Sequence, residues 1–162
     1  MKKIVLLLVC FISYTTVIAQ HEKQGGDEMA ASENYSGAAM MYRLCMEQDD
    51  ECTLKLFKLL YDAKIEAQST NEGYRLISPL AEKGNAEAQY YLGSLYLKDM
   101  GISQRNRKSI NLFKRNAKSS RQNDREANKW FQKSANQGHA AAQYELGRIY
   151  QWSGREKKHR RS

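Results

Sequence analysis

The feature of this sequence that most constrains its fold is an internal repeat at an offset of 54 residues. Residues 80–96 read LAEKGNAEAQYYLGSLY and residues 134–150 read SANQGHAAAQYELGRIY, with nine identical positions among 17. About one identity is expected by chance, and self-similarity at a fixed offset is typical of repeat architectures. A chain built in this way is therefore expected to stack short, similar units.

The spacing of apolar residues predicts that each copy is one helix. The apolar positions fall at i, i+4, i+7 and i+8, which places them on one helix face. The single proline in 162 residues also favours helices over turn-rich β structure. We expect a buried stripe that includes the tyrosines, and its members are Ala88, Tyr90, Leu92, Leu95, Tyr96, Ala142, Tyr144, Leu146, Ile149 and Tyr150.

Matching polar and glycine residues predict where these helices begin. Gly84 and Gly138 stand where a preceding helix should end, and glycine is the preferred residue just after a helix C-terminus. Asn85 and His139 follow them as expected N-caps.

Two further glycines, Gly93 and Gly147, lie in the middle of the predicted helices, where glycine costs about 1 kcal/mol against alanine. We interpret both as points where a neighbouring helix approaches closely. On this interpretation, Gly147→Leu overpacks the contact and unfolds the last helix pair.

A fainter duplication lies between the two copies. Residues 107–117, RKSINLFKRNA, align with residues 125–135, REANKWFQKSA, at an offset of 18 with three matches in 11. Removing this offset from 54 leaves 36 residues, and helix-pair repeats are about 33–47 residues long. The pattern predicts one helix pair plus one extra helix, with helices at residues 36–47, 51–66, 71–83, 86–98, 106–118, 124–136 and 140–151.

The string Ala-x-x-Gly-x-Ala-x-Ala-Gln-Tyr-x-Leu-Gly-x-x-Tyr, with a Trp-Phe helix ending in Lys-x-Ala, resembles the Sel-one-like repeat (SLR) family, which is related to tetratricopeptide repeats. Trp130, Phe131, Lys133, Gly138 and Gly147 are among the matching positions. The resemblance covers residues 71–151 well and residues 36–70 more weakly. It implies an all-α fold, a right-handed α/α solenoid of short helix-turn-helix repeats.

The N-terminus has the layout of a secretory signal peptide. Lys2 and Lys3 precede an apolar run over residues 4–12, and Val17-Ile18-Ala19 forms a cleavage signal before Gln20. The alternative is an uncleaved anchor, although the run is short for a membrane span. We therefore expect an exported, periplasmic or secreted chain. Its domains are a signal peptide (1–19), a disordered polar leader (20–35), a repeat domain (36–153) and a basic tail (154–162).

Cleavage leaves two cysteines, Cys45 and Cys52. An even count in an oxidising compartment favours a disulfide, and two buried free thiols are the alternative. On one straight helix the two residues would lie about 10 Å apart, so a bond requires a turn, where Asp50 is an expected helix cap. Cysteines on either side of such a turn also resemble the secreted, cysteine-rich branch of the SLR family.

Charge is divided unevenly along the chain, which carries +8 overall. Residues 20–104 hold 8 basic and 14 acidic residues, a net −6, whereas residues 105–162 hold 16 basic and 4 acidic residues, a net +12. The basic half is expected to attract an anionic surface if it binds through charge. Export argues against nucleic acid as the partner.

The sequence contains no recognised catalytic, metal or cofactor motif, so we expect no catalytic residues, no metal and no cofactor. The leading hypothesis is an exported scaffold that binds a protein or peptide in a concave groove. The alternatives are a cell-wall or β-lactam-acting enzyme, which the cysteine-rich branch suggests, and a truncated, non-functional array. By analogy with the family, the expected contact residues are Tyr91, Ser94, Lys98, Glu145, Arg148 and Gln151.

Overall fold

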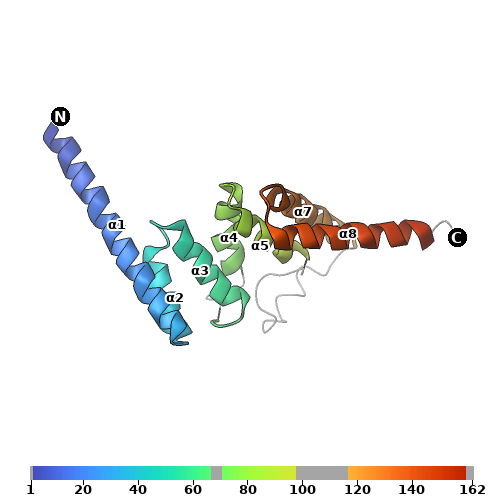
Figure 1. Cartoon of the computed structure of the whole chain (residues 1–162), viewed down its shortest axis with the longest axis horizontal. Helices are drawn as coiled ribbons and strands as arrows, with labels where there is room; N and C mark the ends of the chain where they lie inside the picture. Colours follow the sequence, from blue (N-terminus) through green and yellow to red (C-terminus); the bar gives the residue numbers. More distant parts are fainter. Residues whose placement is uncertain (1, 67–70, 98–116, 160–162) are drawn as a thin grey trace. The chain divides into compact units, whose positions relative to one another are not determined.

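The computed structural model describes residues 2–66, 71–97 and 117–159, with side chains for residues 15–66, 71–97 and 123–151. Every regular element in these ranges is an α-helix, as the sequence predicts (Figure 1). The chain forms two compact units, Met1–Glu66 and Ala67–Ser162. The predicted helix at 106–118 falls outside the described residues up to residue 116. The helices are α1 (Lys2–Ala31), α2 (Tyr35–Cys45), α3 (Asp50–Tyr61), α4 (Glu72–Glu82), α5 (Ala86–Leu97), α7 (Ala117–Asn136) and α8 (Ala140–His159).

The first unit consists of α1, α2 and α3. The Asn34 side chain caps α2 by accepting a hydrogen bond from the Gly37 amide, and Asp49 caps α3 through the Glu51 amide at 2.8 Å. The cap of α3 is thus Asp49, one residue before the predicted Asp50. Helix α3 ends at Tyr61, earlier than predicted, because Ala63 adopts a left-handed conformation with φ of 55°. Buried apolar side chains of α2 and α3 form its core, namely Ala38, Ala39, Tyr42, Cys45, Cys52, Leu54, Leu56, Phe57 and Leu60.

The predicted disordered leader is the main error of the sequence analysis. Residues 20–31 are helical and belong to α1, which packs against α2. The reason lies in Gly25 and Gly26, which weaken an isolated helix but let α1 approach closely. A Cβ atom added at Gly26 would lie 2.5 Å from the Tyr42 ring, and one at Gly25 would lie 3.0 Å from Met41. Tertiary packing against α2 therefore overrides the poor helix propensity of the leader.

The second unit contains two helix hairpins that repeat the same turn. Gly84 and Gly138 have φ of +101° and +85°, which glycine tolerates best. The amide of Gly84 donates to the Ala81 carbonyl, and the amide of the next residue, Asn85, donates to the Leu80 carbonyl. The amides of Gly138 and His139 make the equivalent bonds at an offset of 54. Both hairpins thus use the same C-terminal glycine motif, as the sequence predicts.

The predicted N-caps are also confirmed. The Asn85 side chain accepts a hydrogen bond from the Ala88 amide at 2.9 Å, and Nδ1 of His139 accepts one from the Ala142 amide at 3.3 Å. The His139 ring also stacks on Tyr90, with 5.0 Å between ring centroids.

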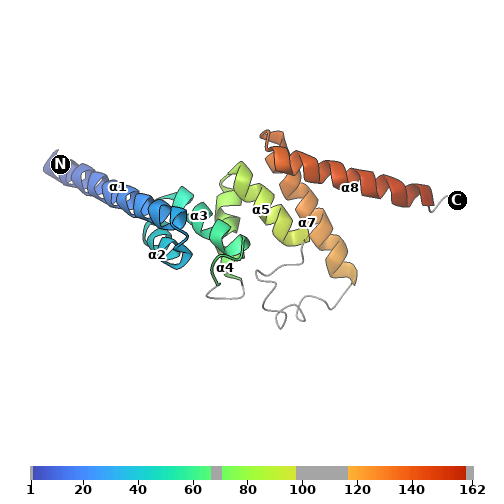
Figure 2. The ribbon, with the colours of Figure 1, turned by 60° about the horizontal axis from the view of Figure 1, so that its bottom comes forward.

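Helices α5 and α7 pack at Gly93. A Cβ atom there would lie 2.9 Å from the Phe131 ring and 3.2 Å from the Ala127 carbonyl oxygen, so Gly93 is a close-approach position as predicted. Figure 2 shows α5 and α7 side by side, with α8 following α7. The fully buried residues Ala127, Phe131 and Ala142 form the core of this region, and Tyr90, Tyr96, Ala135, Leu146 and Ile149 pack around it.

Helix α8 departs from the prediction on one face. No atom of the described residues lies within 4 Å of a Cβ added at Gly147, so the predicted close contact is not found among them, and Gly147→Leu has nothing to overpack there. Tyr144 and Tyr150, predicted as core, are 67% and 54% exposed. The helix also continues to His159, past its predicted end at residue 151 and into the predicted basic tail.

Candidate functional site

The structure separates the six predicted contact residues into groups. On α5, Ser94 is buried and its hydroxyl donates to the Tyr90 carbonyl at 3.1 Å. Tyr91 is half-buried beside Tyr90, with ring centroids 5.3 Å apart. Lys98 lies outside the described residues. Ser94 is therefore engaged in the helix itself rather than presented as a contact.

The three predicted residues on α8 are more accessible. Arg148 and Gln151 are exposed, and Glu145 is half-buried. Nη1 of Arg148 lies 3.0 Å from Glu145 Oε2, an ion pair three residues apart on one helix. The structure thus presents a row of polar residues on α8, namely Glu145, Arg148 and Gln151. The described residues of α5 form no matching row.

Tyr144 lies next to this row. The sequence pattern predicts it as a core residue, but it is exposed at the surface. Its counterpart in the first copy, Tyr90, packs against Phe131 with 5.9 Å between ring centroids. No sequence signal distinguishes the two tyrosines, because they occupy identical positions in the repeat. They differ because α7 covers α5, whereas no helix covers this face of α8 in the described part of the chain.

The hydrogen bonds that hold each hairpin are the same in both copies. Nε2 of Gln89 donates to the Ala81 carbonyl at 3.1 Å, and Nε2 of Gln143 donates to the Ala135 carbonyl at 3.3 Å. Residues that do not take part in these hydrogen bonds differ between the copies, as Tyr91 and Glu145 do. Repeat proteins vary their binding surfaces in this way, by keeping the packing of each repeat constant and changing residues at the surface.

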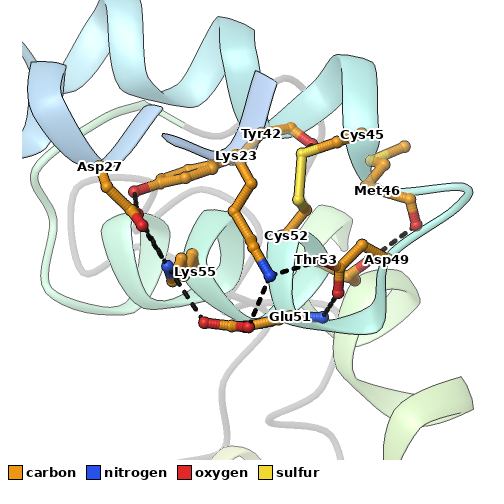
Figure 3. The surroundings of a disulfide bond; sticks show 10 residues. All are labelled: Lys23, Asp27, Tyr42, Cys45, Met46, Asp49, Glu51, Cys52, Thr53 and Lys55. Carbon is orange, nitrogen blue, oxygen red and sulfur yellow. Dashed lines mark hydrogen bonds and ion pairs between the residues drawn. A yellow bond between two sulfur atoms is a disulfide. The ribbon is translucent and has the colours of Figure 1, made fainter. Parts of the chain in front are cut away.

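The first unit carries a polar cluster, made of Lys23 and Asp27 of α1, Tyr42 of α2, Asp49 in the turn, and Glu51 and Lys55 of α3 (Figure 3). Nζ of Lys23 lies 2.8 Å from Asp49 and 2.9 Å from Glu51. Nζ of Lys55 lies 2.7 Å from Asp27 and 3.1 Å from Glu51, and the Tyr42 hydroxyl donates to Asp27 at 2.7 Å. These contacts join all three helices of the unit.

The cluster shifts the pKa values of its carboxylates and of Lys23 toward the charged forms, and keeps the Tyr42 phenol neutral. Burial raises the pKa of Asp27, but hydrogen bonds from Lys55 and Tyr42 outweigh it, so this pKa lies below its ordinary value. The same balance, burial against the bond from Lys23, lowers the pKa of Asp49.

Glu51 responds mainly to the bonds from Lys23 and Lys55, which lower its pKa. Hydrogen bonds to Asp49 and Glu51 raise the pKa of Lys23, and burial together with Asp27 raises the pKa of Tyr42. The mutual pairing of these groups indicates a structural role.

The predicted disulfide is confirmed beside this cluster. Cys45 at the end of α2 and Cys52 in the first turn of α3 are bonded, with 5.9 Å between their Cα atoms. The turn that the bond requires spans the residues between the two helices. The Thr53 hydroxyl strengthens it by donating to the Met46 carbonyl at 3.0 Å. Closing a loop of this size stabilises a fold by about 2–3 kcal/mol in the chain-entropy model.

The described residues contain neither a candidate metal site nor a helix suited to span a membrane. Among them no group of three or more His, Cys, Asp or Glu side chains is placed to hold a metal ion. No helix within the described ranges is both long enough and apolar enough to cross a membrane.

Comparison with known proteins agrees with the repeat pattern. Residues 86–119, 116–139 and 140–159 match the family model described as Sel1 repeat. No curated protein matches the chain significantly.

A solved structure gives an independent comparison. The chain is similar to a crystal structure described as c5321, a protective antigen present in uropathogenic Escherichia coli strains that displays an SLR fold. The TM-score is 0.62 at 26% identity, and the match covers 85% of this chain. The chain spans 27% of the length of that protein. From these findings, residues 86–159 match three Sel1 repeats, and the chain has the all-α helical-repeat solenoid fold called SLR.

Proposed function

We propose that this chain is an exported, non-catalytic scaffold that binds a protein or peptide partner through a concave surface of its repeats. Sel1-repeat helical scaffolds typically mediate protein interactions. Export is proposed from the basic start, apolar run and Val17-Ile18-Ala19 signal of the sequence. The disulfide supports it, since such bonds persist in oxidising compartments.

The observation that carries the proposal is the surface of α8. Tyr144 is 67% exposed, and Arg148 and Gln151 are exposed on the same helix. An aromatic ring beside an arginine is a favourable pairing for a protein contact, because tyrosine and arginine are enriched at binding hot spots. The site is proposed to comprise Tyr144, Arg148 and Gln151, with Glu145 holding the arginine.

The polar groups elsewhere support a non-catalytic role. The carboxylates of the first unit are paired with Lys23 and Lys55, and His139 is engaged as a helix cap. These groups maintain the fold, so the proposed mechanism is passive. Helix stacking fixes the shape of the surface, and exposed side chains select the partner.

The experiment is affinity capture from an envelope extract of the source cell. The bait is the exported, oxidised chain, and beside it run a double variant, Arg148→Glu with Gln151→Ala, and a bait ending at Ser153. Lys129→Glu on α7 serves as the control, because its side chain is 64% exposed and is not among the proposed contact residues. We expect one defined protein to be retained by the wild type, the control and the shortened bait, and to be lost from the double variant.

Other outcomes bear on the basic C-terminal half. Retention that needs the residues after Ser153 and disappears at high salt assigns binding to an electrostatic contact with an anionic surface instead of α8. A folded bait that captures no protein contradicts the proposal.

A further inference from the structure

The exposed face of α8 reads the same in both directions along the helix. Counted outward from Gly147, Tyr144 and Tyr150 stand three residues away on either side, and Gln143 and Gln151 stand four residues away. All five residues are exposed, and spacings of three and four place them on one side of a helix. We call these five residues the α8 face, and its sequence is symmetric about Gly147.

The side chains of the α8 face are accessible and in part held in place. Tyr144 and Tyr150 are 67% and 54% exposed. The Tyr150 hydroxyl accepts a hydrogen bond from Nε2 of Gln132 on α7 at 3.1 Å, and Nε2 of Gln143 donates to the Ala135 carbonyl. These bonds restrict side chains that remain exposed, and a restricted side chain loses less entropy when a partner binds.

The glycine at the centre of the face lets a second helix approach closely. A Cβ atom added at Gly147 would meet none of the described residues within 4 Å. The equivalent glycine of α5, Gly93, shows what this repeat position accepts, because the Phe131 ring and the Ala127 backbone of α7 lie against it. The second unit thus already packs one helix on such a glycine, and the α8 face offers the same opportunity to a helix from outside the chain.

A symmetric face fits a second copy of itself. Two α8 helices that run antiparallel about a two-fold axis at Gly147 bring the face of each copy against the same face of the other. The layer formed by Gln143 and Tyr144 of one copy then meets the layer formed by Tyr150 and Gln151 of the other, and this contact occurs twice. Each contact combines two tyrosine rings with two glutamine amides, which supply aromatic packing and hydrogen bonds.

Charge does not oppose this pairing. The α8 face contains no charged side chain, although residues 105–162 carry a net charge of +12. Arg148 lies at the edge of the face, and Glu145 of the same helix balances it at 3.0 Å. Two copies therefore meet without an unbalanced charge at the contact.

The area of the face sets the strength of the contact. Together the two tyrosines of one copy expose roughly the equivalent of one whole aromatic side chain, which buries about 150–250 Å². A standard stable interface buries about 800 Å² on each partner. The α8 face alone therefore supports a weak dimer that depends on concentration.

We propose that the α8 face is a self-association surface, on which α8 of a second copy of this chain binds antiparallel about a two-fold axis at Gly147. The inference rests on the proposed binding role of α8 and names its partner.

The test is sedimentation velocity of the exported, oxidised chain at concentrations up to about 0.5 mM, because an interface of this size is weak. Tyr144→Asp places a charge in both contacts of the dimer, and Lys129→Asp on exposed α7 surface is the control. We expect the wild type and the control to dimerise, and Tyr144→Asp to dimerise about tenfold or more weakly. Thermal melting shows whether each variant is folded.

A matched pair of double variants tests the antiparallel arrangement. Gln143→Glu with Gln151→Lys places opposite charges in each contact between copies, whereas Gln143→Glu with Gln151→Glu places like charges there. Both carry the same change at residue 143, so any effect on the hairpin is shared. We expect the first variant to dimerise several-fold more tightly than the second. A parallel pairing would set residue 143 against residue 143 and give no such preference.

The outcomes separate this inference from the proposed function. A wild type that stays monomeric at the highest concentration, a dimer that Tyr144→Asp leaves unchanged, or equal dimerisation of the matched pair overturns the inference. A monomeric wild type that captures another protein through α8 leaves the proposed function standing, whereas one that captures nothing contradicts both.

Discussion

At the scale of single residues, two glycines at the same repeat position serve different purposes. A Cβ atom at Gly93 would meet the Phe131 ring and the Ala127 carbonyl, whereas a Cβ atom at Gly147 would meet none of the described residues. The cost of a side chain at each position therefore depends on the neighbouring helix rather than on the helix that carries it.

We expect Gly93→Ala to destabilise the second unit by about 1–3 kcal/mol, because its Cβ atom overpacks a backbone oxygen as well as a ring. We expect Gly147→Ala to be neutral or to stabilise by up to about 1 kcal/mol, since alanine is the better helix former. Urea unfolding measures both. Equal effects of the two substitutions would contradict the packing described here.

His139 permits a second comparison. Its Nδ1 atom caps α8 by accepting from the Ala142 amide, which is the role that Asn85 plays for α5. We expect His139→Ala to cost about 1 kcal/mol in unfolding free energy, and His139→Asn to recover most of it because asparagine is a good N-cap. The comparison separates capping from stacking on Tyr90. If His139→Asn is as unstable as His139→Ala, the ring contact and not the cap is what matters.

At the scale of helices, the leader is the element that sequence reasoning misplaced. Its glycines and polar residues are typical of disordered segments when only local propensity is considered. In the structure, Gly26 lets α1 pack closely against the Tyr42 ring of α2. A hydrogen bond from the Tyr42 hydroxyl to Asp27 also connects α1 and α2. These contacts involve residues distant in sequence, so local patterns did not reveal them.

We expect Gly26→Leu to destabilise the first unit by about 1–3 kcal/mol through overpacking against α2. The matched control is Gln24→Leu, an exposed position on the same helix, which should change stability by less than about 0.5 kcal/mol. Thermal melting of the oxidised proteins provides the readout. A leader without a structural role would tolerate both changes equally.

The polar cluster makes the stability of the first unit depend on pH. The pKa values of Asp27, Asp49 and Glu51 are lower in the folded chain than in the unfolded one. Such groups contribute stability above their unfolded pKa of about 4, and this contribution is lost as pH falls through the lower folded values. We expect the first unit to become less stable below about pH 4.

Replacing both lysines, Lys23→Met with Lys55→Met, should flatten that dependence, because the carboxylates lose the partners that lower their pKa. The measurement is the urea midpoint between pH 7 and pH 3. The effect should be modest, since the pairs are partly exposed and salt screens them. An equally steep acid dependence in the double variant would assign it to other groups.

At the scale of the whole molecule, the sequence predicts the features that recur in each repeat, and it does not predict which repeat surfaces are covered by another helix. The predicted helices that fall in the described residues, the caps at Asn85 and His139, and the disulfide are present, and they follow from local patterns and from the cysteine count. The predicted helix at residues 106–118 lies outside the described residues up to residue 116. The exposure of Tyr144 does not follow from local patterns, because it depends on whether another helix covers α8. Of the predicted contact residues, Arg148 and Gln151 are exposed for the same reason, while Ser94 is buried.

The central claim is that α8 presents a surface on which another polypeptide binds. It is tested most directly by replacing Tyr144 with the photo-crosslinking residue p-benzoylphenylalanine in the source cell and irradiating. The control places the same residue at Lys129 on exposed α7 surface. We expect a single crosslinked species of defined mass from position 144, either a dimer of this chain or its complex with another protein, and none from position 129. No crosslink at position 144, or the same mixture of products from both positions, would contradict the claim.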